Sequence, residues 1–208
     1  MILYAAIDSV DYRLVRAFRT QVGAAVFAPF VARVKHRHKD FGWPGENSAE
    51  AAVWTLIRAQ PANLLDPKYR DWHALLVDAA QHVADELGKQ PGGLAARSWG
   101  DYNRSEINHA LSPALPGWLA RFIDMPHEPL PGDNNMPRVS GPGFGASERL
   151  DVSPGHEDKG ILEMPGGQSD NPLSPYFGAG HDDWIKGRPT PLLPGATEHL
   201  LVLLPANR

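Results

Sequence analysis

Proline and glycine are spread unevenly along this chain, and this limits its possible folds more than any other feature. Residues 1–125 contain 7 prolines and 8 glycines, whereas residues 126–208 contain 13 and 12. Proline lacks the backbone N–H that helices and sheets use, and glycine weakens both. Long helices are therefore expected only in the first part. We predict an α+β chain with a helical part, residues 1–125, and a turn-rich β part, residues 126–208.

The first expected helix follows Ser9, which is placed to cap it. Its apolar residues recur at steps of three and four, which puts them on one helical face. They are Val10, Leu14, Val15, Phe18, Val22, Val26 and Phe30. Pro29 should end or bend this helix, because proline cannot donate the hydrogen bond that the next turn needs.

Two further helices are expected in the same part. One starts at Asn47, where Glu50 completes a capping box, and buries Ala49, Val53, Leu56 and Ile57. The other runs over residues 71–87, with Gly88 closing it in the left-handed conformation. Its apolar face consists of Trp72, Leu75, Leu76, Ala79, Val83 and Leu87.

The β part offers few strands. Residues 146–152 and 160–164 suit two strands joined by the turn at residues 153–159, and the glycine-rich residues 141–147 suit a bend before them. Residues 199–205, "HLLVLLP", form a continuous apolar run of the kind found in strands covered on both faces. Such a strand needs neighbours, and this sequence supplies too few. The two parts are therefore expected to form one incomplete domain.

Composition excludes several classes of function. A formal charge of −4 with no basic stripe gives no reason to expect a nucleic-acid partner. Cysteine is absent, so neither disulfides nor thiolate chemistry is expected. The apolar start is only about seven residues long and runs into Asp8, which is too short for a signal peptide or a membrane span. We expect no membrane partner.

Histidines beside charged residues raise the question of a metal site. His36 and His38 flank Arg37, and the positive charge there opposes binding of a cation. "GHED" and "GHDD", residues 155–158 and 180–183, place adjacent residues that rarely point at one ion. Turn and helix-cap bonds to backbone N–H groups explain these acidic residues better. We predict no metal ligands.

A serine triad is the other catalytic candidate. It would combine Ser169, His181 and either Asp182 or Asp170, but nothing in their spacing selects them. The nucleophile elbow G-x-S-x-G is missing, because "GQSDN" lacks the final glycine. We predict no catalytic and no substrate-binding residue in this chain.

The β part resembles the end of the penicillin acylase family of N-terminal nucleophile hydrolases. The resemblance lies in the ordered motifs "GDNNMPR", "GASER", "GGQS", "PLSP" and "PTPLLP", residues 132–138, 145–149, 166–169, 172–175 and 189–194. The helical part is similar from "YRLVRAFR" onward. The resemblance implies a fragment of the four-layer αββα fold, from the C-terminal part of the β chain.

The resemblance also implies a chemistry. Family members hydrolyse linear amides, such as a β-lactam side chain or an acyl-homoserine lactone, and this would connect the chain to antibiotic biosynthesis. Their nucleophile is a serine at the start of the β chain, whose own α-amine acts as the base. That serine, its oxyanion donors and the family's calcium ligands lie upstream of the matched part. We therefore expect no cofactor in this chain, and expect the remainder of the acylase as its partner. Family members are usually periplasmic or secreted.

The resemblance also bears on Ser9 and on the loop at residues 166–169. Ser9 is rejected as the nucleophile because it opens an amphipathic helix, whereas the family's serine opens a core strand. Gly166, Gly167, Gln168 and Ser169 match the family's loop after a sheet strand, and we interpret them as a structural turn. The alternative to an enzyme fragment is a stand-alone, non-catalytic binding or assembly module derived from the same fold.

Overall fold

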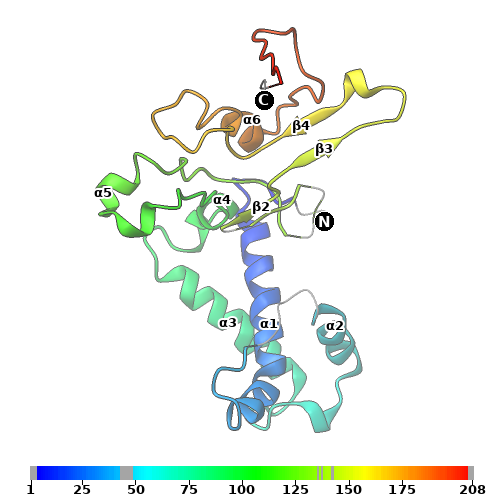
Figure 1. Cartoon of the computed structure of the whole chain (residues 1–208). Helices are drawn as coiled ribbons and strands as arrows, with labels where there is room; N and C mark the ends of the chain where they lie inside the picture. The colour runs from blue at the N-terminus through cyan, green and yellow to red at the C-terminus, as the bar shows by residue number, and fades with distance from the viewer. Residues whose placement is uncertain (1–3, 43–48, 135, 137, 142, 206–208) are drawn as a thin grey trace. The chain divides into compact units, whose positions relative to one another are not determined.

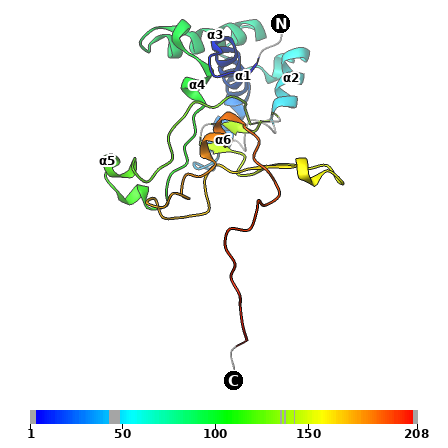
Figure 2. The ribbon, with the colours of Figure 1, turned by 90° about the horizontal axis from the view of Figure 1, so that it is seen from above.

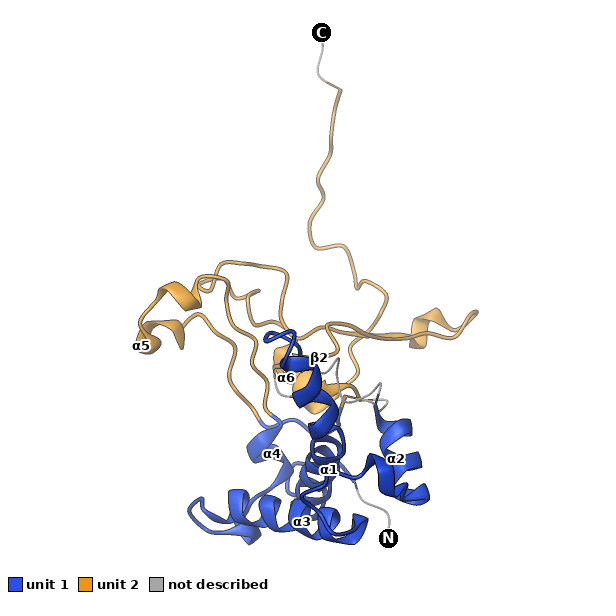
Figure 3. Ribbon diagram, turned by 90° about the horizontal axis from the view of Figure 1, so that it is seen from below, with its two compact units in different colours: residues 1–103, 129–133 blue, residues 104–128, 134–208 orange. Residues whose placement is uncertain are grey.

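The computed structural model describes residues 4–42, 49–134, 136, 138–141 and 143–205. These residues form an α+β structure, as predicted, in which most helices precede the short strands and one short helix follows them (Figure 1). The chain divides into two units. Unit 1 comprises residues 1–103 and 129–133, and unit 2 comprises residues 104–128 and 134–208 (Figure 3). Within the part of the chain that is described, no helix is both long and apolar enough to cross a membrane.

The first helix, α1, spans Val10–Lys35 and begins where the sequence predicts. The Ser9 hydroxyl accepts a hydrogen bond from the Tyr12 N–H at 3.1 Å, so the cap is confirmed. Pro29 lies inside the helix and does not end it. The predicted apolar face is partly wrong, since Val15 is 40% exposed. Adjacent residues point about 100° apart on a helix, so Leu14 and Val15 cannot both lie at the centre of one face.

The next helices are α2, Glu50–Ala59, and α3, Trp72–Gly88. Asn47, the predicted start of the second helix, lies outside the described residues. The Asp71 carboxylate caps α3 by accepting from the Ala74 N–H at 2.7 Å. The prediction for Gly88 is wrong: it is the last residue of the helix, and Lys89 follows in a right-handed conformation. The chain turns later, at Gly92 and Gly93, which both have positive φ.

Unit 1 has an apolar core between α1 and α3 (Figure 1). Its buried members are Val22, Ala25, Val26, Trp72, Leu75 and Ala79. The face of α2 that was expected to be buried packs against this cluster through Val53, Leu56 and Ile57, while Trp54 stays 62% exposed. The apolar residues that recur at steps of three and four therefore do form a core.

The remaining helical elements are short. They are α4 (Trp99–Tyr102), α5 (Gly117–Ala120) and α6 (His181–Lys186), with 3-10 turns at Ala62–Leu64, Leu94–Ala96, Ser112–Ala114 and Glu157–Lys159. Ser98 and Asp101 form a reciprocal capping box at the start of α4. Such a box lets even a four-residue helix satisfy its first N–H groups.

The described residues of unit 2 form two small antiparallel sheets. In one, β1 (Ser140–Gly141) pairs with β2 (Phe144–Gly145). In the other, β3 (Arg149–Asp151) pairs with β4 (Ile161–Glu163), which confirms the predicted hairpin although both strands are shorter than expected. The free edge of β4 is covered by residues 190–192: Leu162 N–H donates to the Thr190 carbonyl at 3.0 Å, and Leu192 N–H to the Gly160 carbonyl at 2.8 Å.

The terminal apolar run does not form a strand with other described residues. Residues 193–205 contain no helix or strand, and from residue 197 on they run as extended chain (Figure 2). The five side chains from Leu200 to Leu204 are between 64% and 83% exposed. A stretch of this composition that remains uncovered leaves both apolar surface and backbone hydrogen-bonding groups in water.

Candidate functional site

The loop at residues 164–177 is shaped by one glycine. A Cβ atom at Gly167 would overlap the carbonyl group of Tyr176, so only glycine fits there. The Gly167 N–H donates to the Phe177 carbonyl at 2.9 Å, which closes the loop on itself. At Gly166, a Cβ atom would meet the Met125 side chain at 3.3 Å, a tight contact but not an impossible one.

The polar side chains of this loop bond within the loop, mostly to its backbone. The hydroxyls of Ser169 and Ser174 accept from the N–H groups two residues later, and the Asn171 amide oxygen accepts from the Leu173 N–H at 3.0 Å. The Gln168 amide donates to the Met164 sulfur at 3.3 Å. These are turn-forming bonds, which hold the backbone in place. That the loop supports neighbouring parts of a larger enzyme stays a prediction.

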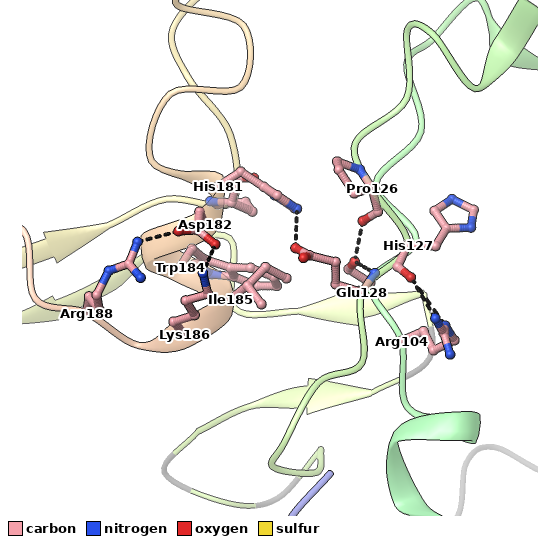
Figure 4. Close-up of polar contacts among 12 residues, drawn as sticks. Arg104, Pro126, His127, Glu128, His181, Asp182, Trp184, Ile185, Lys186 and Arg188 are labelled. Carbon is pink, nitrogen blue, oxygen red and sulfur yellow. Dashed lines mark hydrogen bonds and ion pairs between the residues drawn. The ribbon is translucent and has the colours of Figure 1, made fainter.

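His181 lies buried at the start of α6, and both of its ring nitrogens face partners other than Ser169. Nδ1 is 2.7 Å from the Pro165 carbonyl, so it carries the hydrogen and donates. Nε2 points at the Glu128 carboxylate, 3.6 Å away (Figure 4). The ring also stacks on Trp184. The geometry therefore does not assemble the triad considered from the sequence.

Trp184 on α6 is the centre of a buried cluster in unit 2. Its indole N–H donates to the Ala146 carbonyl at 2.8 Å, and the Arg149 guanidinium lies 4.7 Å above its ring. Arg149 also pairs with Glu163 at 2.9 Å, across the β3–β4 hairpin. Burial, and secondarily the charge of Arg149, lower the pKa of the Arg138 guanidinium, which donates to the Ile185 carbonyl.

The two acidic clusters form different bonds. Glu157 accepts from the Gly155 N–H at 2.9 Å, and this bond lowers the pKa of its carboxyl, as turn chemistry predicts. The prediction is wrong for Asp182 and Asp183, which pair with side chains instead of capping α6. Asp182 pairs with Lys186 and Arg188, which lower the pKa of its carboxyl (Figure 4). Since Gly180 precedes α6, the helix gets no side-chain cap.

Metal binding finds no support among the described residues. No three or more of their His, Cys, Asp and Glu side chains gather into a group that could hold an ion. His36 follows the last turn of α1, where Arg33 and Lys35 add positive charge. That the family's calcium ligands lie upstream of this chain stays a prediction.

Unit 1 contains a buried carboxylate that the sequence analysis missed. Asp133 accepts from the Tyr12 hydroxyl and from the Arg16 guanidinium, both at 2.8 Å. Burial, and then the Asp133 carboxylate, raise the pKa of Tyr12 to about 12. Trp99 adds a bond from its indole N–H to the Gly132 carbonyl at 2.8 Å. The signal was present: Tyr12 and Arg16 lie four residues apart on one helical face, and the Gly-Asp turn offers an acceptor.

Known proteins match this chain over two different ranges. A stretch of 83 residues, 39% of this chain, is 34% identical to the serine/threonine-protein phosphatase 2A activator 1 of Saccharomyces cerevisiae. The stretch spans 20% of that protein's length, so it establishes no common family. The family model described as penicillin amidase matches residues 3–198, nearly the whole chain and every motif named above. This chain belongs to the penicillin amidase family.

Proposed function

We propose that this polypeptide is the C-terminal part of the β chain of a penicillin-amidase-type amidohydrolase. The assembled enzyme would hydrolyse the amide between an acyl group and an amine, as in a β-lactam side chain or an acyl-homoserine lactone. The polypeptide alone would be inactive, because the nucleophilic serine and its oxyanion donors belong to the upstream part.

The family match over residues 3–198 carries this proposal, and the geometry of the serines supports it. The Ser9 hydroxyl is engaged as the cap of α1. The Ser169 hydroxyl accepts a hydrogen bond from the Asn171 N–H. Within the described residues, no histidine forms a hydrogen bond with this hydroxyl. A serine nucleophile needs a base within hydrogen-bond reach, so neither residue is equipped for attack.

The partner in this proposal is the remainder of the acylase. The run from Leu200 to Leu204 is exposed in the present chain and has the composition of a strand that is covered on both faces. Strands of the upstream part would cover it and pair with its backbone. The turn at Gly166, Gly167, Gln168 and Ser169 would then hold neighbouring loops of the complete enzyme.

A direct test compares the chain alone with the reassembled enzyme on a chromogenic amide. We expect no turnover by the purified 208 residues, and turnover when they are produced together with the reading frame encoded directly upstream. Turnover by the chain alone that Ser169→Ala or His181→Ala abolishes, with Ser174→Ala as the control, would overturn the proposal. A separate promoter with no such upstream frame would instead support the non-catalytic module.

A further inference from the structure

Unit 1 contains an open groove of about 240 Å³ that the proposed amidase chemistry does not use. One wall is a face of α1 that includes Arg13 and Ala17, and the other is a face of α3 that includes Val83 and Leu87. Tyr102, at the end of α4, closes one side. The groove is therefore built by regular elements next to the apolar core, which makes its shape well defined.

Arg13 is the arginine of this groove that forms no ion pair within the described residues. Its guanidinium lies 4.2 Å from the centre of the Tyr102 ring, and the charge of the Asp101 carboxylate acts on it without a direct ion pair. The other charges of the groove are paired: Arg16 with Asp133, and Glu86 with Lys89. Arg13 is also half-buried, and this burial lowers the pKa of its guanidinium. Its charge is thus partly removed from water and only partly compensated, by the Tyr102 ring and by the Asp101 carboxylate, which forms no ion pair with it.

We propose that this groove binds a small organic carboxylate with an apolar body. The carboxylate would accept two parallel hydrogen bonds from Arg13, whose planar guanidinium matches it in shape. The apolar body would lie on Ala17, Val83 and Leu87. The Tyr102 ring covers one face of the guanidinium and leaves its N–H edge available, so less side-chain freedom is lost on binding.

The size of the groove limits the ligand. A volume of about 240 Å³ is below that of most drug-sized sites and suits a molecule of roughly ten non-hydrogen atoms. For such a small ligand in an open groove, we expect a dissociation constant of about 1 mM. A short linear acid such as hexanoate has the required head and body.

Protection of arginines from phenylglyoxal tests this site in the full chain. Modification is measured residue by residue by peptide mass spectrometry, with hexanoate, hexanamide or acetate present. Roughly 10 mM hexanoate should slow modification of Arg13 about tenfold, since protection follows one plus the ratio of ligand concentration to dissociation constant. Arg33, exposed near the far end of the same helix, is the internal control and should react unchanged.

The other two ligands test separately whether the site requires the negative charge and whether it requires the apolar body. Hexanamide lacks the charge and acetate lacks the apolar body, so neither should protect Arg13 more than about twofold at the same concentration. Equilibrium dialysis provides a second measurement: Arg13→Gln should weaken hexanoate binding at least fivefold, and Arg33→Gln should leave it unchanged. Equal protection by acetate or hexanamide, protection of Arg33 as well, or binding unaffected by Arg13→Gln would each overturn the proposal. None of these outcomes bears on whether the assembled enzyme cleaves amides.

Discussion

The interiors of the two units are stabilised by different kinds of interaction. Unit 1 is built around apolar side chains that face one another across α1 and α3, including Leu75 at 1% exposed and Ala79 at 0%. Unit 2 is built around Trp184, where guanidinium, indole and carboxylate groups bond to one another and to backbone carbonyls. Apolar packing depends on volume and little on pH or salt, whereas a charged cluster depends on every partner being present. The two units should therefore respond to different substitutions.

The largest effect is expected in the core of unit 1. Leu75→Ala removes a side chain that is 1% exposed and leaves a cavity beside Val22 and Ala79, which should lower the free energy of unfolding by about 4 kcal/mol. Urea unfolding followed by circular dichroism at 222 nm measures this loss. Val77→Ala, at a 53% exposed position on the same helix, should change stability by less than about 0.5 kcal/mol. Equal losses for both variants would contradict the core described here.

The charged cluster of unit 2 should show the next largest effect. Glu163→Gln keeps the shape of a 5% exposed residue but removes the charge that pairs with Arg149. The largely buried guanidinium then loses its carboxylate and keeps the Trp184 carbonyl and ring as partners. We expect a loss of about 3 kcal/mol, which corresponds to hydrogen exchange roughly 100-fold faster in β3 and β4. Mass spectrometry of peptides from both strands measures it. Asp182→Asn, in an exposed ion pair on α6, is the control and should leave exchange in these strands unchanged. Unchanged exchange in Glu163→Gln would show that apolar contacts to Trp184 hold the hairpin.

The same contrast explains how much of the structure the sequence could predict. The helices of unit 1 follow from apolar periodicity and from caps such as Ser9 and Asp71, because both signals are local. The hairpin of β3 and β4 follows from two short runs and a turn. The carboxylate of Asp133 and the ring of Trp184 could not be placed, because their partners lie 117 to 121 and 38 residues away in sequence. Polar contacts between residues far apart in sequence leave no periodic pattern. In this chain such contacts form the surroundings of Asp133 and Trp184.

A smaller effect that depends on pH is expected at Tyr12 in unit 1. Its folded pKa of about 12 lies above the unfolded value of 10.0, so the protonated phenol is favoured in the folded state. The stability it contributes is fully present below pH 10 and is lost as pH rises from 10 toward 12. Urea titrations at several pH values should show this decline. In Tyr12→Phe the decline should be weaker, with a loss of about 1–2 kcal/mol already present at pH 7 because Asp133 loses a donor. A decline of equal size in wild type and Tyr12→Phe would assign it to other groups.

The smallest effect on stability is expected at the terminal run of unit 2, where the change should appear in association instead. Leu201 and Leu203 are 82% and 83% exposed, and alternate residues of an extended segment lie on one face. Replacing both by lysine should therefore leave the free energy of unfolding unchanged within about 0.5 kcal/mol. Light scattering should nevertheless show less self-association, since exposed apolar strands pair with other chains and charged residues oppose this. Thr197→Lys with His199→Lys adds the same charge outside the apolar residues Leu200–Leu204, so it separates the effect of apolar surface from that of net charge. If Leu201→Lys with Leu203→Lys destabilised the chain, other residues of this same chain would have to cover the apolar run. The need for an upstream partner would then disappear.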